Sequence, residues 1–151
     1  MADAEKLVPG TWFITKTLFD GRVNHVMMTF TSDGGMVERA EPTLEAGIGV
    51  WKPGDEGDEE DEFRFMFYRF QESLTITEPP EEKKGEKEEK EEVDVSFDHI
   101  QRIRSTNRLT SHHAFQGTET VDFLDATGTL DTAMPTFHNT LRAVRLKLVP
   151  E

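Results

Sequence analysis

Apolar and polar side chains alternate along most of this chain, in eight runs that are separated by turn residues. A period of two places successive side chains on opposite faces, which is typical of β-strands. The predicted strands are 10–18, 23–32, 35–41, 46–53, 62–72, 94–109, 112–125 and 136–148. The pattern therefore predicts an all-β protein, an antiparallel up-and-down barrel of about eight strands.

Turn chemistry agrees with this prediction. Residues 32–35 and 125–128 contain Asp and Gly, which accept the positive φ of tight hairpin turns, while residues 2–8 suit a short helical turn. A sheet of short strands can remove its unpaired edges by closing on itself. With eight strands, the interior is either filled by side chains or large enough for one small molecule.

Two ends of the chain carry a family resemblance. Gly10, Thr11 and Trp12 open the first predicted strand, and Arg145 lies in the last one. This pairing resembles the lipocalins and the wider calycin group, which implies that Arg145 packs across the Trp12 indole and closes the barrel. The turn in 30–34, the run 47–51 and the aromatic residues of 63–67 resemble small bacterial lipocalin-like proteins. That resemblance implies a hydrophobic small-molecule ligand.

The alternation also predicts which side chains face inward. The apolar residues on that face are predicted to contact a ligand: Met28, Phe30, Trp51, Phe65, Phe67, Phe115 and Phe137. Gly47 and Gly49 share the face of Trp51, so we expect space beside its indole. On the opposite face, Met27, Ile48 and Val50 would suit a homodimer.

Polar residues with the inward parity are Arg69, Gln101, Asn107, His113, Glu119 and Asn139. One interpretation is a filled core in which Glu119 and Arg69 form a buried ion pair. The other is a barrel open at one mouth, where a desolvated Glu119 serves as general acid or base and Arg69 or Asn139 holds a developing oxyanion. His113 is six residues from Glu119, about 20 Å along a strand, so it could take part only near the mouth.

Charge is concentrated in two segments. The chain has a net charge of −13, of which 54–62 carries −7 and 78–92 carries −4, so the remainder is nearly neutral. Nucleic acid is therefore not an expected partner. Segment 78–92 has almost nothing apolar to bury, which predicts a flexible insert, with an exposed helix held by charge pairs as the alternative. The acidic run in 55–62 lacks the spacing of a calcium loop.

The remaining features bound the function. The 151 residues correspond to one domain, 1–151, and the absence of cysteine excludes disulfides and thiolate sites. No run suits a membrane span or signal peptide, so we expect a cytoplasmic protein with no membrane partner. No metal-binding spacing, phosphate loop or serine elbow occurs, so neither metal nor cofactor is predicted.

Three functions remain consistent with these residues. The favoured one is a cofactor-independent isomerase or cyclase that acts on a hydrophobic biosynthetic intermediate inside the barrel. The second is a lipocalin-like carrier of a hydrophobic ligand, which would be indifferent to Glu119→Gln. The third is an interaction protein that presents its acidic loops to a basic partner, with a salt-sensitive contact.

Overall fold

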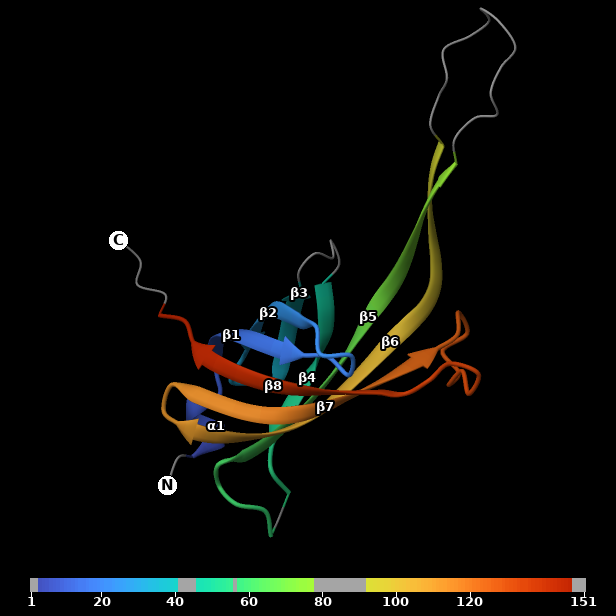
Figure 1. Ribbon diagram of the computed structural model, residues 1–151. Coiled ribbons are helices and arrows are strands. Elements are labelled where there is room, and N and C mark those ends of the chain that lie inside the picture. The colour runs from blue at the N-terminus through green and yellow to red at the C-terminus, as the bar shows by residue number, and fades with distance from the viewer. Residues whose placement is uncertain (1–2, 41–45, 56, 78–91, 148–151) are drawn as a thin grey trace, which may run out of the picture.

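The computed structural model describes residues 3–40, 46–55, 57–77 and 92–147, with the backbone alone for 71–77 and 92–98. A short helix, α1 (Ala4–Leu7), precedes eight strands. The strands are β1 (Gly10–Thr17), β2 (Val23–Phe30), β3 (Gly35–Ala40), β4 (Ala46–Pro53), β5 (Glu62–Thr77), β6 (Glu92–Ser111), β7 (Ala114–Leu124) and β8 (Phe137–Arg145). They pair in chain order into a closed antiparallel up-and-down barrel, which confirms the predicted fold (Figure 1).

The largest difference from the predicted strands lies in β5 and β6. Both strands run further than expected, and Figure 1 shows them continuing past the rest of the barrel as a paired arm. Their alternation persists there, since Leu74 pairs with Val95 and Ile76 with Val93. The predicted insert 78–92 therefore overlaps β6 at Glu92, and residues 78–91 lie outside the described part of the chain.

Both predicted hairpin turns are present. Gly34 has φ +95° in the β2–β3 turn, and Gly128 has φ +83° in the β7–β8 connection. In that connection, the Asp125 carboxylate accepts hydrogen bonds from the backbone amides of Thr127 and Thr129 at 2.9 and 3.1 Å. Residues with tolerance for positive φ therefore stand where the chain reverses.

One end of the barrel is closed by α1 and the residues that follow it. The Trp12 indole donates a hydrogen bond of 2.9 Å to the Val8 carbonyl. The Arg145 guanidinium lies 4.4 Å from the Trp12 ring and donates to the carbonyls of Pro9 and Leu7. Strand pairing sets Trp12 opposite Arg145, so these contacts join β1, β8 and the N-terminal segment.

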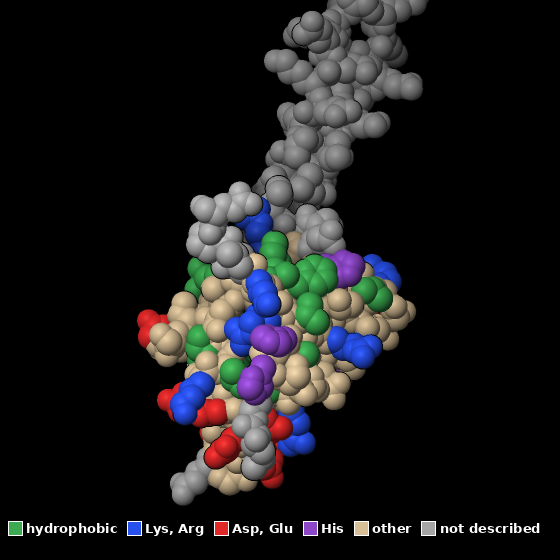
Figure 2. Space-filling model, turned by 90° about the vertical axis from the view of Figure 1, so that its left-hand side faces the viewer, with side chains coloured by type: hydrophobic (Ala, Val, Ile, Leu, Met, Phe, Trp, Pro, Cys, Tyr) green, Lys and Arg blue, Asp and Glu red, His purple; other side chains and the backbone are tan. Residues whose placement is uncertain are grey.

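Figure 2 views the molecule from the left of Figure 1, the side of this closed end. Cationic, histidine and hydrophobic side chains lie side by side there, whereas acidic side chains gather near the lower edge. That edge is at the height of the β4–β5 turn in Figure 1, the segment in which the sequence concentrates acids.

Next to the closed end, aromatic rings fill the barrel interior. Phe115 contacts Trp12 and Phe63 with ring centroids 4.9 and 5.0 Å apart, and Phe30 contacts Phe63 at 6.1 Å. These four side chains are buried, and they meet mostly edge to face, the geometry that aromatic quadrupoles favour. We call this set, Trp12, Phe30, Phe63 and Phe115, the aromatic layer.

The expected space beside Trp51 is not present. A Cβ atom on Gly47 would lie 2.5 Å from the Phe67 ring, and one on Gly49 would lie 2.0 Å from the Met66 carbonyl. The two glycines therefore permit Phe67 and the β5 backbone to approach β4 closely, and neighbouring atoms occupy the volume that their missing side chains leave.

Candidate functional site

A cluster of ionisable side chains occupies the interior beyond the aromatic layer. Lys16 on β1 places Nζ 3.0 Å from Oε2 of Glu119 on β7. Asn139 on β8 donates to Oε1 of Glu119 at 2.9 Å, and its own Oδ1 accepts from the Phe19 amide at 3.1 Å. The side chains of Lys16 and Glu119 are only 5% and 1% exposed, so this ion pair is fully inside the barrel.

A second pair lies in the same half of the barrel. Arg69 on β5 donates through Nη1 to Oε1 of Glu38 on β3 at 3.1 Å. Its Nε and Nη2 both donate to Oε1 of Gln101 on β6, at 3.1 and 2.6 Å. The Glu38 side chain has no exposed surface, whereas Arg69 is 16% exposed. We call Lys16, Glu38, Arg69, Gln101, Glu119 and Asn139 the polar cluster.

The two pairs interact electrostatically. Burial raises the pKa of Glu38, and the negative charge of Glu119 adds to that rise, although the positive charges of Arg69 and Lys16 oppose it. Desolvation thus outweighs two cations at this carboxyl. Lys16 also lies 5.5 Å from the Phe67 ring, where the π face attracts its charge.

Aromatic residues cover the polar cluster at the other end, which we call the mouth. Phe19, after β1, stacks on Phe137 at the start of β8 with ring centroids 4.3 Å apart. Phe123, near the end of β7, meets Phe137 edge to face at 5.9 Å. Phe19 is 59% exposed. The polar cluster therefore lies between the aromatic layer and an aromatic rim that solvent reaches.

The β7–β8 connection is fixed beside the mouth by charged contacts. Asp122 accepts from Arg102 at 2.8 Å, from Arg104 at 2.7 Å and from the Thr136 hydroxyl at 3.2 Å. Burial acts to raise the pKa of Asp122, but the hydrogen bonds from Arg102 and Thr136, with the Arg104 charge, lower it overall. Nε2 of His99 lies 2.9 Å from Asp131 in the same connection.

Three of the four predicted catalytic residues are brought together. Glu119, Asn139 and Arg69 all belong to the polar cluster, but the predicted Glu119–Arg69 ion pair is wrong, because each residue has a different charged partner. The predicted inward orientation of His113 is also wrong. His113 is exposed in the β6–β7 turn at the closed end, since β7 begins only at Ala114 and the alternation does not extend into the turn.

The predicted ligand-contacting residues are inside the barrel. Six of them are buried and belong to one core cluster: Met28, Phe30, Trp51, Phe65, Phe67 and Phe115. They contact one another, as in the stack of Phe65 and Phe67 with ring centroids 5.9 Å apart. Phe137 differs from them, because it is half-buried and lies in the rim.

Sequence reasoning missed Lys16 and Glu38. Each had a usable signal, because Lys16 has the parity of Trp12 and Ile14, and Glu38 has the parity of Met36. Charged side chains are almost never fully buried without a partner. If the inward parity is applied to the charged residues near the end of each strand, it predicts that both Lys16 and Glu38 face the interior.

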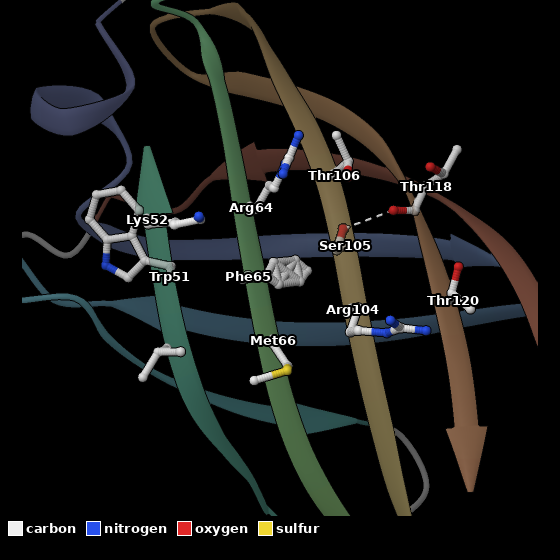
Figure 3. Close-up of a pocket in the computed structure, with 11 residues that line it drawn as sticks. Trp51, Lys52, Arg64, Phe65, Met66, Arg104, Ser105, Thr106, Thr118 and Thr120 are labelled. Atoms are coloured by element: carbon white, nitrogen blue, oxygen red, sulfur yellow. Dashed lines mark hydrogen bonds between the residues drawn. The ribbon is translucent and has the colours of Figure 1, made fainter. Parts of the chain in front are cut away.

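The outer surface has a hollow of its own. It has a volume of about 570 Å³ and lies over β4 to β7. Figure 3 shows Lys52 on β4, Arg64 on β5 and Arg104 on β6, with threonine 106 on β6 and threonines 118 and 120 on β7. Each of these cations has a carboxylate partner: Asp55 for Lys52 and Arg64, and Asp122 for Arg104. The hollow therefore carries little uncompensated positive charge.

Apolar side chains are exposed beside that hollow. Ile48, Val50 and Met27 are 68%, 56% and 52% exposed, which confirms that they face outward. In the register, Ile48 pairs with Tyr68 and Val37, so these side chains form a continuous outer strip. Whether this strip supports a homodimer stays a prediction.

No helix in the described part of the chain is sufficiently long and apolar to cross a membrane. Within the same ranges, no three histidine, aspartate or glutamate side chains are grouped so that they could hold a metal ion.

Comparison with known proteins adds little. No family model matches the chain, and no curated protein sequence matches it. Among solved structures, the chain is similar to a redesigned β-barrel at 14% sequence identity, with a TM-score of 0.38, over 97% of this chain and 98% of that one. The barrel fold described above therefore rests on the strand pairing of this chain itself.

Proposed function

We propose that the barrel binds a small, largely apolar molecule at the polar cluster and converts it as a cofactor-independent isomerase or cyclase. The observation that carries this proposal is the presence of two cations and two carboxylates within the barrel, contributed by β1, β3, β5 and β7. Removing such groups from water costs several kcal/mol per ion, and apolar residues of similar volume would often stabilise a fold at least as well. A role in binding or chemistry explains why they are there.

The surroundings of the polar cluster suit a ligand of mixed character. The rim residues Phe19, Phe123 and Phe137 offer aromatic surface to an apolar body. A hollow of about 440 Å³ on the outer surface adjoins Arg69 and has apolar walls that include Tyr68 and Ile100. Of the four residues in the two ion pairs, Arg69 has the most exposed side chain, so the ligand is proposed to approach the polar cluster from the side of Arg69.

In this function, Glu119 is the proposed general base. Lys16 and Asn139 contact its two oxygens and hold the carboxylate in one orientation, and they belong to strands that are adjacent in the barrel. A base held in one orientation can take a proton from carbon when the ligand binds beside it. Arg69 is then available to stabilise negative charge that develops on the ligand. The lipocalin-like resemblance supports an apolar ligand in the barrel.

A carrier without chemistry is the second candidate, and one observation favours it. Both carboxylates already have cationic partners, which is the arrangement expected of groups that only orient a bound molecule. A carrier would use the same rim and the same polar cluster. It would leave every covalent bond of its ligand unchanged.

The first test is native mass spectrometry of freshly purified protein, followed by solvent extraction and identification of any released molecule. We expect an apolar molecule in the wild type. The extracted molecule is then incubated with protein in D₂O, and its deuterium content is measured by mass spectrometry. An isomerase or cyclase that moves protons introduces deuterium or changes the structure of the molecule, whereas a carrier does neither.

Two variants separate these outcomes. Glu119→Gln should retain the ligand and lose deuterium incorporation by about 10²-fold or more if Glu119 is the base. Glu62→Gln is the matched control, because it removes the same charge from a residue at the start of β5 that pairs with Arg108 on the surface. Protein that is empty and binds no hydrophobic dye would contradict both candidate functions.

A further inference from the structure

We infer that Glu38 is a general acid that donates a proton to the carbonyl oxygen of the ligand, and that the substrate is a carbonyl compound with an acidic neighbouring C–H bond. This inference rests on the proposed function and names its substrate class. It assigns a catalytic residue that the sequence pattern did not reveal. Four observations on the residues around Glu38 support it.

The first observation is the unequal environment of the two Glu38 oxygens. Oε1 accepts the hydrogen bond from Arg69, whereas Oε2 is buried and has no hydrogen-bond partner. A buried carboxylate oxygen without a partner is costly, but a protonated one becomes a donor. With the guanidinium held at Oε1, the proton belongs on Oε2, which then needs an acceptor.

The second observation is that Glu119 and Glu38 have different contacts. Glu119 has a lysine at 3.0 Å and an amide donor at 2.9 Å. Glu38 has one guanidinium and the backbone amide of Gly47, and burial raises its pKa. Two carboxyl groups in such unequal environments are suited to act as an acid and a base in one reaction.

The third observation concerns the remaining free position at Glu119. Oε2 of Glu119 faces Lys16 at ion-pair distance but makes no hydrogen bond of acceptable geometry. This oxygen is therefore the position from which the base can accept a proton. Lys16 stays near enough to offset the charge of Glu119 before the transfer.

The fourth observation is the backbone beside Glu38. A Cβ atom on Gly47 would lie 2.7 Å from Oε2 of Glu38, so a side chain at this position would press against the proposed acid. Glycine at position 47 thus lets the β4 backbone and the Phe67 ring lie close to this oxygen. Groups that face Glu38 from the surrounding strands are Arg69 on β5, Lys16 on β1, Glu119 on β7 and the backbone amide of Gly47 on β4.

The reaction that follows is an isomerisation through an enol. Glu119 takes a proton from the carbon next to the carbonyl, and the C–H electron pair forms a C=C bond. The carbonyl π pair moves to oxygen, which receives the proton of Glu38. When the substrate already has a C=C bond at the β,γ position, return of the Glu119 proton to the γ carbon, with return of the enol proton to Glu38, moves that double bond next to the carbonyl and restores both carboxyl groups. No oxidant or reductant is consumed.

The test uses three naphthalene probes with the same ring: 2-acetylnaphthalene, 1-(2-naphthyl)ethanol and 2-ethylnaphthalene. Binding is measured by fluorescence, the carbonyl stretch of bound 2-acetylnaphthalene by infrared difference spectroscopy, and exchange of its methyl protons in D₂O by ¹H NMR. We expect the wild type to bind the ketone, to lower its carbonyl frequency and to accelerate the exchange. The ethyl compound should show no exchange.

The variants assign the roles. Glu38→Gln should reduce the exchange rate by about 10²- to 10⁴-fold while the ketone still binds, the range that general acid–base groups contribute. In the wild type, exchange should fall as pH rises through the pKa of Glu38, which burial raises. Glu38→Asp, which keeps the acid on a shorter side chain, should retain part of the rate. Glu62→Gln should leave it unchanged.

The outcomes distinguish this inference from the proposed function. A ketone that binds without a lower carbonyl frequency, or exchange that survives Glu38→Gln, would overturn the role of Glu38 and leave a ligand-binding barrel. Preferred binding of the alcohol over the ketone would overturn the substrate class. If no probe binds and the purified protein is empty, the proposed function fails as well. The infrared measurement needs only the wild type, so it decides the question even if a variant does not fold.

Discussion

The two halves of the barrel interior use opposite chemistry. The closed half is filled by rings in contact, with Trp12, Phe63 and Phe115 at its centre. The mouth half instead encloses ions, with Lys16 and Glu119 almost wholly buried. Burial of aromatic surface accounts for the stability of the first half without further assumptions. The second half would be a poor choice for stability alone, because each buried ion costs several kcal/mol of desolvation.

The largest loss of stability is expected from a substitution at the closed end. Trp12→Ala should lower the free energy of unfolding by about 3–5 kcal/mol, because it removes a large buried ring together with its contacts to Phe115 and Arg145. Denaturation by guanidinium would measure it. Tyr68→Ala, on the outer face, is the control and should change stability by less than about 1 kcal/mol. Equal losses would mean that the aromatic layer is not the main source of stability.

The next effect concerns the ion pair in the mouth half. Lys16→Met should cost about 3 kcal/mol, since it leaves the Glu119 charge buried without a cation. Adding Glu119→Gln removes that charge and keeps an oxygen for Asn139, so the double variant should recover to within about 1 kcal/mol of wild type. Urea denaturation of both variants tests this. A double variant as unstable as the single one would show that the ion pair itself stabilises the fold.

A smaller loss of stability is expected from a substitution on β4. Gly49→Ala should destabilise the protein by about 2 kcal/mol, because the new Cβ would lie 2.0 Å from the Met66 carbonyl and the backbone would have to move. Gly35→Ala is the control, since its closest contact is the Thr31 hydroxyl at 3.0 Å, which can rotate away. Thermal unfolding followed by circular dichroism compares the two. Similar melting temperatures would contradict close packing at β4.

The smallest expected effect is a dependence on pH that differs in sign between two carboxyl groups. The pKa of Glu38 is raised in the folded protein, so its contribution to stability is present below its ordinary value of 4.5 and is lost as pH rises through the folded pKa. The pKa of Asp122 is lowered, so its contribution is present above 3.8 and is lost as pH falls.

Variants isolate each contribution to this pH dependence. Stability of Glu38→Gln relative to wild type should increase as pH rises above 4.5. Stability of Asp122→Asn relative to wild type should increase as pH falls below 3.8. Chemical denaturation at a series of pH values measures both differences. A Glu38→Gln difference that does not vary with pH would contradict the opposite signs expected for Glu38 and Asp122.

The strand order and closure could be predicted because alternation and turn residues are local signals. Gly34 and Gly128 mark their turns through positive φ, and the aromatic residues of β5 show which side chains face inward. Partners inside the barrel could not be predicted in the same way. Parity places Glu119 and Arg69 in the interior, but it does not say that Lys16 and Glu38 reach them from other strands.

The limits of parity are visible at two positions. His113 has the inward parity of Phe115, yet it lies in a turn where the strand geometry has ended. Gly47 and Gly49 suggested an open volume, but the space left by a missing side chain is available to any neighbour, and Phe67 and the β5 backbone occupy it. Three-dimensional packing, which no single strand encodes, decides both cases.

The pairing of Trp12 with Arg145 also has a consequence for synthesis of the chain. Because the first strand closes the barrel against the last one, no ribosome-bound fragment that lacks β8 can complete the fold. Until β8 emerges, β1 and β7 present unpaired edges that other chains can join. Such distant pairing also slows folding. During translation, the risk of aggregation through these edges therefore lasts until β8 has left the ribosome.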